Sequence, residues 1–263
     1  MTRVTYVRLA AAMVALAAVM SVFLLQFEWF GPAASEQRGP IDTLFDVMIV
    51  LSSVVFSIVL VMFTYAIWKF RVKPGDEGDG KPIHGNTKLE IAWTVIPTII
   101  VLFGAGYSWS VLNDIETHDA NALTVDVFSQ QYAWSFGYPS EGDVWSQGEL
   151  RVPLGRQVQL EMHSQDVIHS FWVPEWRIKK DNVPGITTTA VVTPDRVGTY
   201  QLICTELCGF GHAAMRAKVV VEPPAQFRKW VGGLKEKVPP DYLQSIRQDT
   251  ETNPVQPLGA GGA

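Results

Sequence analysis

Three long apolar stretches dominate the first 112 residues of the chain. Residues 9–25 carry no charge and follow Arg3 and Arg8, a pattern typical of either a signal peptide or a short membrane span. Residues 47–68 and 91–112 are each twenty-two positions long without a charge, enough for a helix to cross a hydrocarbon core of roughly 30 Å. We therefore predict a hairpin of two membrane-spanning helices, preceded by a signal peptide or a third span. Two buried helices of a soluble domain are the less favoured alternative, because such helices are rarely charge-free over this length.

From residue 113 onward the pattern changes to short alternating runs broken by Gly, Pro, Asp and Ser. Alternation of apolar and polar positions predicts half-buried strands, here at 123–128, 158–162, 187–192, 199–203 and 217–221. Strands at this spacing indicate a sandwich or a barrel. After Pro223 and Pro224, apolar residues three and four positions apart predict an amphipathic helix over 225–237, and the last fifteen or so residues have the composition of an unstructured tail.

The charges orient this arrangement. The loop at 69–90 carries five basic residues, whereas 26–41 carries only Arg38, so the positive-inside bias places the first loop in the cytoplasm and everything after residue 112 outside. The exported part up to residue 225 holds fourteen acidic and eight basic residues. Its basic residues are too few and too scattered for a nucleic-acid partner.

The only two cysteines, Cys204 and Cys208, are four positions apart and are followed by His212 and Met215. A disulfide suits an exported domain, but so short a loop would add little stability, and it leaves the imidazole and the thioether unexplained. A redox dithiol usually has two residues between its sulfurs, and here there are three. Metal binding accounts for all four side chains, because thiolate and thioether favour copper and imidazole suits copper or zinc.

A copper site on a β-sandwich needs a further imidazole from an upstream loop. Three histidines are poorly placed for this, because they lie in the cytoplasmic loop, beside the membrane exit or one position past a strand's alternation: His84, His118 and His163. His169 is then the predicted ligand. A single cysteine would give a mononuclear centre, whereas two allow both sulfurs to bridge two coppers. His169 and His212 would be terminal ligands, with Met215 and the main-chain carbonyl of Glu206 completing the set.

The motif Cys-x-Glu-x-Cys-x3-His-x2-Met, with Asp-Val-Ile-His-Ser upstream and Leu-Glu-Ile-Ala-Trp-Thr-Val-Ile-Pro at 89–97, resembles cytochrome c oxidase subunit II over about residues 40–225. The resemblance implies a membrane helical hairpin followed by an all-β, cupredoxin-like Greek-key sandwich. It implies four parts: a signal peptide or extra span with its linker at 1–40, the hairpin at 41–112 with the cytoplasmic loop 69–90, the sandwich at 113–225, and a helix with a disordered tail at 226–263.

The family's function is then expected of this chain. As subunit II of a proton-pumping oxidase in a bacterial plasma membrane, it would take electrons from a separate cytochrome c, soluble or membrane-bound, and pass them to the haem-copper subunit I that reduces oxygen; subunit III is a further expected partner. The resemblance implies a binuclear copper A centre and a magnesium ion shared with subunit I through Glu206. The implied copper ligands are His169, Cys204, the Glu206 carbonyl, Cys208, His212 and Met215.

Other residues match family positions less specifically. The aromatic stretch at 131–136 places Tyr132 where the family usually has the electron-accepting tryptophan, with Trp134 two positions on, although Trp134 also suits strand packing. The resemblance implies an acidic docking face for a basic cytochrome and a proton path that starts at the cytoplasmic mouth of the second span. The predicted docking residues are Asp166, Glu141 and Asp143, and the predicted proton-path residue is Glu90. Ordinary surface charge and helix capping remain alternatives.

Two other classes of function compete with this one. A membrane-tethered copper carrier or oxidase assembly factor would need exchangeable copper on an open surface, whereas this chain offers a closed set of six donors. A quinol oxidase subunit would keep the hairpin and sandwich without the copper ligands, which are intact here. No Cys-x-x-Cys-His motif occurs, so haem cannot be attached in the usual way, and the electron donor is expected to be a separate protein.

Overall fold

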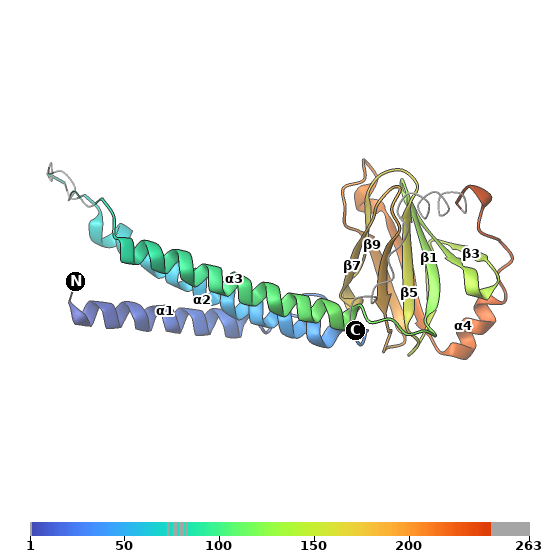
Figure 1. Cartoon of the computed structure of the whole chain (residues 1–263), viewed down its shortest axis with the longest axis horizontal. Coiled ribbons are helices and arrows are strands. Elements are labelled where there is room, and N and C mark those ends of the chain that lie inside the picture. Colours follow the sequence, from blue (N-terminus) through green and yellow to red (C-terminus); the bar gives the residue numbers. More distant parts are fainter. Residues whose placement is uncertain (1, 73, 76–77, 79–81, 83, 243–263) are drawn as a thin grey trace, which may run out of the picture. The chain divides into compact units, whose positions relative to one another are not determined.

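The structure is a computed structural model that describes residues 2–72, 74–75, 78, 82 and 84–242. It divides into two compact units (Figure 1). The first comprises residues 1–28 and 42–111, and the second comprises Trp29–Ile41 together with everything from residue 112 onward. The predicted tail lies outside the described residues, as does part of the predicted cytoplasmic loop. The domain boundaries predicted at 40, 112 and 225 stay predictions.

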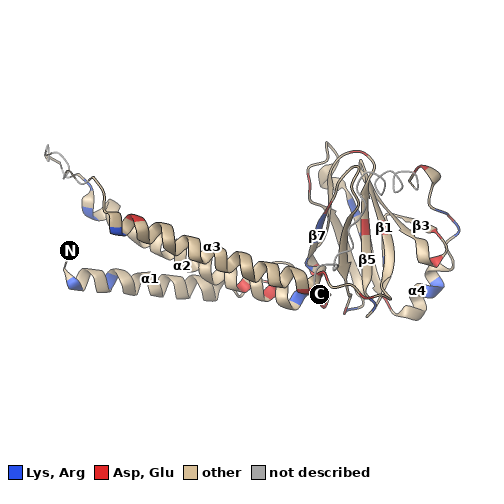
Figure 2. Ribbon diagram, viewed as in Figure 1, with Lys and Arg blue, Asp and Glu red and all other residues tan. Residues whose placement is uncertain are grey.

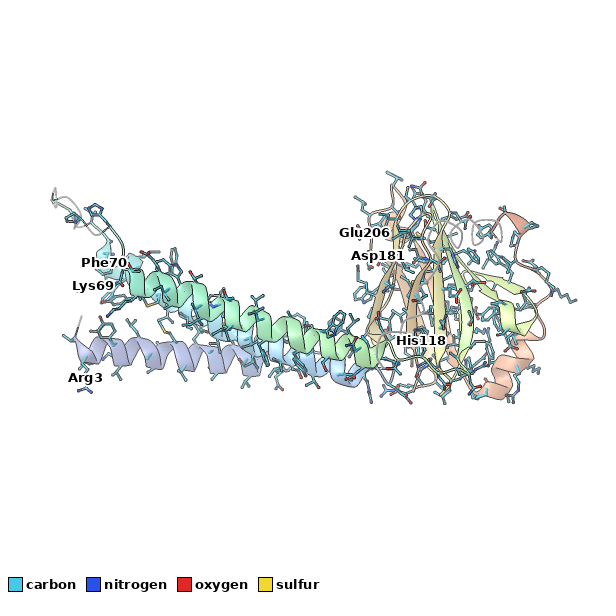
Figure 3. All side chains as sticks on the ribbon, viewed as in Figure 1. Arg3, Lys69, Phe70, His118, Asp181 and Glu206 are labelled. Atoms are coloured by element: carbon cyan, nitrogen blue, oxygen red, sulfur yellow. The ribbon has the colours of Figure 1, made fainter. Side chains whose placement is uncertain are left out.

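The first unit consists of helices α1 (Arg3–Leu24), α2 (Arg38–Phe70) and α3 (Thr87–Ile115), of which the ends of α2 and α3 reach into the second unit. All three are long and apolar enough to cross a membrane. Their charged residues gather toward the helix ends (Figure 2). Arg3 and Lys69 lie at the same end of this unit (Figure 3), as the positive-inside bias requires of a chain with three spans.

Helix α3 contains Pro97 in its interior. A proline removes one backbone hydrogen bond, and membrane helices tolerate it because neighbouring side chains satisfy the backbone groups that it frees. Thr94 and Thr98 in the same turns donate their hydroxyls to the carbonyls of Glu90 and Thr94, at 2.9 and 2.7 Å. The helix continues through the proline to Ile115.

The second unit is a sandwich of two five-stranded sheets, which confirms the predicted fold class. The first sheet has the order β3 (Val144–Gln147), β2 (Ala133–Tyr138), β1 (Leu123–Gln130), β5 (Val158–Ser164) and β8 (Thr188–Val192). The second has the order β4 (Glu149–Pro153), β10 (Arg216–Glu222), β9 (Gly198–Cys204), β6 (His169–Val173) and β7 (Ile178–Asn182). The pairs β1/β5 and β4/β10 are parallel, and the other pairs are antiparallel.

The main core lies between the sheets and is built from the inward positions of each strand. Alternation sends Val125 and Val127 of β1 into this core, while Asp126 and Phe128 face the other side of the sheet. Both cysteines and Met215 belong to the same core. The loop that carries Cys208 and leads to Met215 is therefore anchored in the main core.

Five of the ten strands were predicted, namely β1, β5, β8, β9 and β10. The predicted C-terminal helix is shorter than expected: α4 spans Pro224–Val231 and ends before Gly232 and Gly233. The chain after it pairs along the edge of the first sheet, where the N–H of Trp145 donates to the carbonyl of Glu236 at 2.9 Å. Its Val238 packs with Phe128 and Trp145 on the outer face of that sheet.

Candidate metal centre

Two neighbouring strands and one loop build the candidate site. Cys204 is the last residue of β9, and its register partner Phe171 lies two residues after His169, which opens β6. The loop after Cys204 contains Cys208 and the short 3-10 helix His212–Ala214 and returns through Met215 into β10. Backbone bonds close the loop, since the N–H of Cys204 donates to the carbonyl of Met215 at 3.1 Å.

The predicted donor atoms converge. The two sulfurs lie 3.8 Å apart, and Cys204 Sγ lies 3.9 Å from Nδ1 of His169 and 3.4 Å from the carbonyl oxygen of Glu206. Cys208 Sγ lies 3.6 Å from Nδ1 of His212 and 3.8 Å from Sδ of Met215. Both cysteines are free, and their separation far exceeds the roughly 2.05 Å of a disulfide bond.

Burial and hydrogen bonding shift the pKa values of the two thiols in opposite directions. Burial alone would raise the pKa of the Cys204 thiol, but hydrogen bonds with His169 and with the backbone lower that pKa to about 6. Burial and the adjacent Cys204 sulfur raise the pKa of Cys208 to about 11. The Cys204 thiol therefore ionises more readily than the Cys208 thiol, and binding of a metal by both sulfurs would release the remaining protons.

Family comparisons identify the chain. Residues 18–111 match the transmembrane domain of cytochrome c oxidase subunit II, and residues 146–223 match the periplasmic domain of the same subunit. Cytochrome c oxidase subunit 2 of Thermostichus vulcanus is 36% identical over 250 residues, covering 75% of this chain and 76% of the relative. The chain belongs to the cytochrome c oxidase subunit II family. The resemblance seen in the sequence motifs is confirmed.

Two further similar proteins are a quinol oxidase subunit and a separate periplasmic domain. Quinol oxidase subunit 2 of Bacillus spizizenii is 31% identical and covers 80% of this chain and 66% of the relative. Among solved structures, the periplasmic domain of subunit II of the cytochrome oxidase of Bradyrhizobium japonicum is 26% identical, covers 45% of this chain and 96% of that one, and has a TM-score of 0.43. The matched transmembrane and periplasmic domains make this subunit II a membrane protein with a periplasmic domain.

The residues of this subunit II site fit copper. His169, Cys204 and Cys208 offer ligand atoms that lie within 4.8 Å of one another, and all three are buried. Met215 is also fully buried and adds a thioether. Thiolate and thioether are soft donors that favour copper over harder cations, and the imidazoles are compatible with it.

The side chain of Asp166 orients one predicted ligand. Its Oδ1 lies 2.8 Å from Nε2 of His169, so the other ring nitrogen, Nδ1, faces Cys204. Burial would raise the pKa of Asp166, but its hydrogen bonds, of which that with His169 is the largest, lower the pKa below the usual value. A carboxylate on the outer nitrogen fixes the tautomer and ring orientation of a metal-binding histidine.

Tyr132 and Trp134 flank the loop in different ways. Tyr132 is 42% exposed, and its ring lies directly against the loop, since a Cβ built on Gly211 would fall 2.5 Å from its Cδ2. Trp134 is buried, and its ring centroid lies 6.2 Å from that of His169 in an edge-on arrangement. The structure brings both predicted electron-uptake residues to the candidate site.

Sequence reasoning missed Gln131, which ties this aromatic segment to the loop. Its Nε2 donates to the carbonyl of Cys208 at 2.5 Å, and its backbone N–H donates to Oδ2 of Asp166 at 2.8 Å. In the sequence, Gln131 is an ordinary polar residue beside an aromatic run, so these contacts could not be predicted. They arise because the turn from β1 to β2 carries Gln131 to the end of the sandwich where the loop lies.

The structure does not bring the other two predicted docking residues to the loop. Chain direction places Glu141 and Asp143 at the far end of β2, whereas Tyr132 precedes its near end. Glu141 pairs there with Arg156 at 3.8 Å. Glu206 and His118 also lie at opposite ends of the sandwich (Figure 3), which agrees with setting His118 aside as a ligand.

Glu90 has a visible local role at the start of α3. Its Oε1 accepts the backbone N–H of Asn86 at 3.1 Å, while Oδ1 of Asn86 accepts the N–H of Leu89 at 3.3 Å. Such reciprocal bonds satisfy N–H groups at a helix start that lack helical partners. The proton-path role of Glu90 stays a prediction beside this capping role.

Proposed function

We propose that the site is a binuclear copper centre and that the periplasmic domain uses it to accept electrons from a c-type cytochrome. The proposed ligands are His169, Cys204, the Glu206 carbonyl, Cys208, His212 and Met215. One observation carries the proposal: these donors surround two unlinked sulfurs 3.8 Å apart within a buried core. Two copper ions bound by these residues would supply a centre that gains and loses one electron.

The chain's own contribution is a rigid frame for these donors. Strands β6 and β9, the backbone bond between Cys204 and Met215, and the Asp166–His169 hydrogen bond fix the donors before metal arrives. Fixed ligands change position little when the charge of a bound group changes, so the reorganisation energy of electron transfer is small. The loop therefore favours fast transfer over chemical conversion of a substrate.

The route of electron uptake is proposed from exposure and contact. Tyr132 presents an aromatic ring to solvent and packs against the loop at Gly211, whereas Trp134 is buried against His169. Tyr132 is therefore the proposed contact with the donor, and Trp134 is a proposed packing partner of the metal ligand. The complete donor set favours a cytochrome donor over a quinol, which would not need a metal relay.

Docking and partner contacts are proposed for the end of the sandwich that carries the loop. Asp166 is the docking residue that the geometry favours, because it is partly exposed beside Tyr132. Glu141 and Asp143 at the opposite end have no such support. Leu207 and Phe210 are strongly exposed apolar residues of the loop, and such residues often mark surfaces that a partner covers.

The remaining proposals concern the whole oxidase. The subunit would pass electrons to the haem-copper subunit I, next to a subunit III, in a proton-pumping complex of a bacterial plasma membrane. The exposed side chain of Glu206 would hold magnesium together with subunit I, because a carboxylate is a natural ligand of that hard cation. Glu90 would lie near a proton path.

Replacement of Cys208 by serine tests the function. In the purified oxidase, Cys208→Ser removes one bridging thiolate, so we expect the mixed-valence near-infrared absorption to disappear and turnover with cytochrome c to fall at least about 100-fold. Optical spectra and oxygen consumption measure both. Retained absorption with full activity would refute the ligand assignment, and copper that exchanges rapidly with a chelator would favour a copper carrier instead.

A further inference from the structure

A second group of metal-binding side chains lies in the same sandwich on parallel strands β1 and β5. Asp126 is the register partner of Glu161, and His163 follows two residues later on the same side of β5. These side chains occupy the outer face of the first sheet, because the alternating neighbours point into the main core: Val125, Val127, Leu160 and Met162. The group is therefore separate from the copper loop.

The distances within this group suit a shared ion. One ligand atom from each of Asp126, Glu161 and His163 lies within 4.8 Å of the other two. Nε2 of His163 is 3.8 Å from Oδ1 of Asp126, which is too long for a hydrogen bond. Two donors bound to one zinc ion at roughly 2.0–2.2 Å lie about 3–4 Å apart, so the observed spacing leaves room for an ion between them.

The surroundings hold the imidazole and one carboxylate in place. The ring of His163 stacks on Phe128 with centroids 5.2 Å apart and an interplanar angle of 27°. Its Nδ1 lies 3.3 Å from Oγ1 of Thr187, which directs Nε2 toward the carboxylates. Gln159 Nε2 donates to Oε1 of Glu161 at 2.9 Å. Outer hydrogen bonds of this kind are typical of metal ligands.

The electrostatics of the group favour a cation. His163 is fully buried and Asp126 is 7% exposed, while Glu161 is half-buried. Burial, and then the nearby charge of Asp126, raise the pKa of the Glu161 carboxyl above its usual value. Two carboxylates beside each other in a poorly hydrated place repel, and a bound divalent ion removes this repulsion.

The neighbouring strand β2 carries a glycine beside the Asp126 carboxylate. Gly137 on β2 is the register partner of Asp126, and a Cβ there would lie 3.1 Å from a methyl group of Val238 and 3.4 Å from Oδ2 of Asp126. A side chain at position 137 would therefore crowd the Asp126 carboxylate. The C-terminal segment that carries Val238 lies along this outer face.

We propose that Asp126, Glu161 and His163 form a second metal site of this protein, for a divalent cation of the zinc class. One imidazole and two carboxylates without a thiolate favour zinc over Cu(I), and a three-ligand protein set leaves a coordination position for water. The ion would join β1 to β5 beneath the C-terminal segment.

The first test measures zinc retention in the copper-loaded full-length chain, in which copper occupies the cysteine site. After dialysis against micromolar Zn²⁺ and then buffer, mass spectrometry of metals should find about one zinc per wild-type chain. Asp126→Asn and Glu161→Gln should retain at least about tenfold less zinc per chain than wild type while keeping their copper. The matched control Glu141→Gln changes a carboxylate at the end of the same sheet and should retain zinc.

Zinc retention equal in wild type, Asp126→Asn and Glu161→Gln would overturn the proposal, as would no retention by wild type. The second test needs no variant and covers the case in which the substitutions prevent folding. Co²⁺ added to the copper-loaded wild-type chain should give weak visible bands from nitrogen and oxygen ligands. Strong near-ultraviolet bands from cobalt–thiolate bonding would show that the ion binds at the cysteines instead. No cobalt bands would show that the ion does not bind. Either result would refute the site.

Discussion

Two glycines of the metal-binding loop are needed for different reasons. Gly209 has φ +125°, a backbone region that residues with a side chain rarely adopt. Gly211 has an ordinary φ of −87°, so any residue could take its backbone conformation. Its constraint is contact, because a Cβ would fall 2.5–2.6 Å from ring atoms of Tyr132. The small size of Gly211 therefore allows Tyr132 to lie on the loop.

This contact predicts a selective defect in Gly211→Ala. The added methyl group must displace the Tyr132 ring, while the metal-binding side chains keep their backbone positions. We expect electron uptake from cytochrome c to slow about tenfold, with the copper absorption preserved, because tunnelling rates fall steeply with donor distance. Stopped-flow reduction of the purified oxidase measures the rate.

The double variant Gly211→Ala/Tyr132→Ala provides the control. It removes the clash, so Gly211→Ala should add little to the defect of Tyr132→Ala alone. Equal uptake rates in wild type and Gly211→Ala would show that the placement of Tyr132 does not limit transfer.

The convergence of the proposed donor residues could be predicted from the sequence because chemistry and spacing coincide in one loop. Cys204, Cys208, His212 and Met215 are local neighbours, and His169 was predicted from the poor placement of the other histidines. Residues whose role depends on which end of the sandwich they reach could not be read in this way. Glu141 and Asp166 are both acidic positions in the exported part, yet β2 carries the first away from the loop.

At the scale of elements, periodicity predicted five strands and missed five, and the missed strands have separate reasons. Strand β2 alternates Trp134, Phe136 and Tyr138 with small residues, but five of its six positions are buried because the C-terminal segment packs near its outer face, so it lacks the charged positions that mark a solvated face. Strand β7 reads Ile-Lys-Lys-Asp-Asn, whose charges hide it. Strands β3 and β4 are separated by Gly148 alone, which made two short strands resemble a loop.

One tyrosine joins the two sheets at the end away from the loop. Tyr138 on β2 accepts the backbone N–H of Arg151 on β4 at 3.0 Å and donates its hydroxyl to the Arg151 carbonyl at 3.1 Å. The side chain is completely buried. Burial raises the pKa of Tyr138 far above its usual value, because the phenolate would lose its hydration.

This shift predicts how the sandwich responds to alkali. The neutral phenol is favoured in the folded state, so its contribution is fully present below the unfolded pKa near 10 and is lost as pH rises from there toward the folded pKa. The free energy of unfolding should fall by about 1.4 kcal/mol per pH unit from this group. In the folded chain at about pH 11, Tyr138→Phe and wild type should show equal tyrosinate absorbance.

Denaturation supplies the comparison for this prediction. In guanidinium at the same pH, the wild-type chain should gain one tyrosinate more than Tyr138→Phe. An extra tyrosinate in the folded wild type near pH 10 would mean that Tyr138 is accessible to solvent and does not lock β2 to β4.

At the scale of the whole molecule, the segment between α1 and α2 is part of the periplasmic unit. Trp29–Ile41 groups with the sandwich, and its backbone bonds to two separate loops of it. The N–H of Ala34 donates to the carbonyl of Glu175 at 2.8 Å, and that of Glu36 donates to the carbonyl of Thr193 at 3.0 Å. Residues 29–41, which follow α1, thus belong with the sandwich, as expected of a chain in which α1 is the first of three spans.

Arg177 holds this segment through main-chain contacts. Its guanidinium donates to the carbonyls of Phe30 and Gly31 at 3.2 and 3.4 Å and lies 5.1 Å above the Phe30 ring. Hydrogen bonds from a charged donor contribute about 1.5–3 kcal/mol each at most, and the stacked ring adds about 0.5–1 kcal/mol. Loss of this side chain should therefore free the segment while the metal-binding loop stays intact.

We expect Arg177→Ala to raise the rate of cleavage after Glu36 by a glutamate-specific protease at least about tenfold, because cleavage requires local opening of the segment. Mass spectrometry of the fragments of the copper-loaded full-length chain measures the rate, and the copper absorption should be unchanged. Lys179→Ala, which removes an exposed cation on the adjoining strand β7, is the matched control and should be cleaved like wild type. Equal cleavage of Arg177→Ala and wild type would show that the backbone bonds of Ala34 and Glu36 hold the segment without the guanidinium.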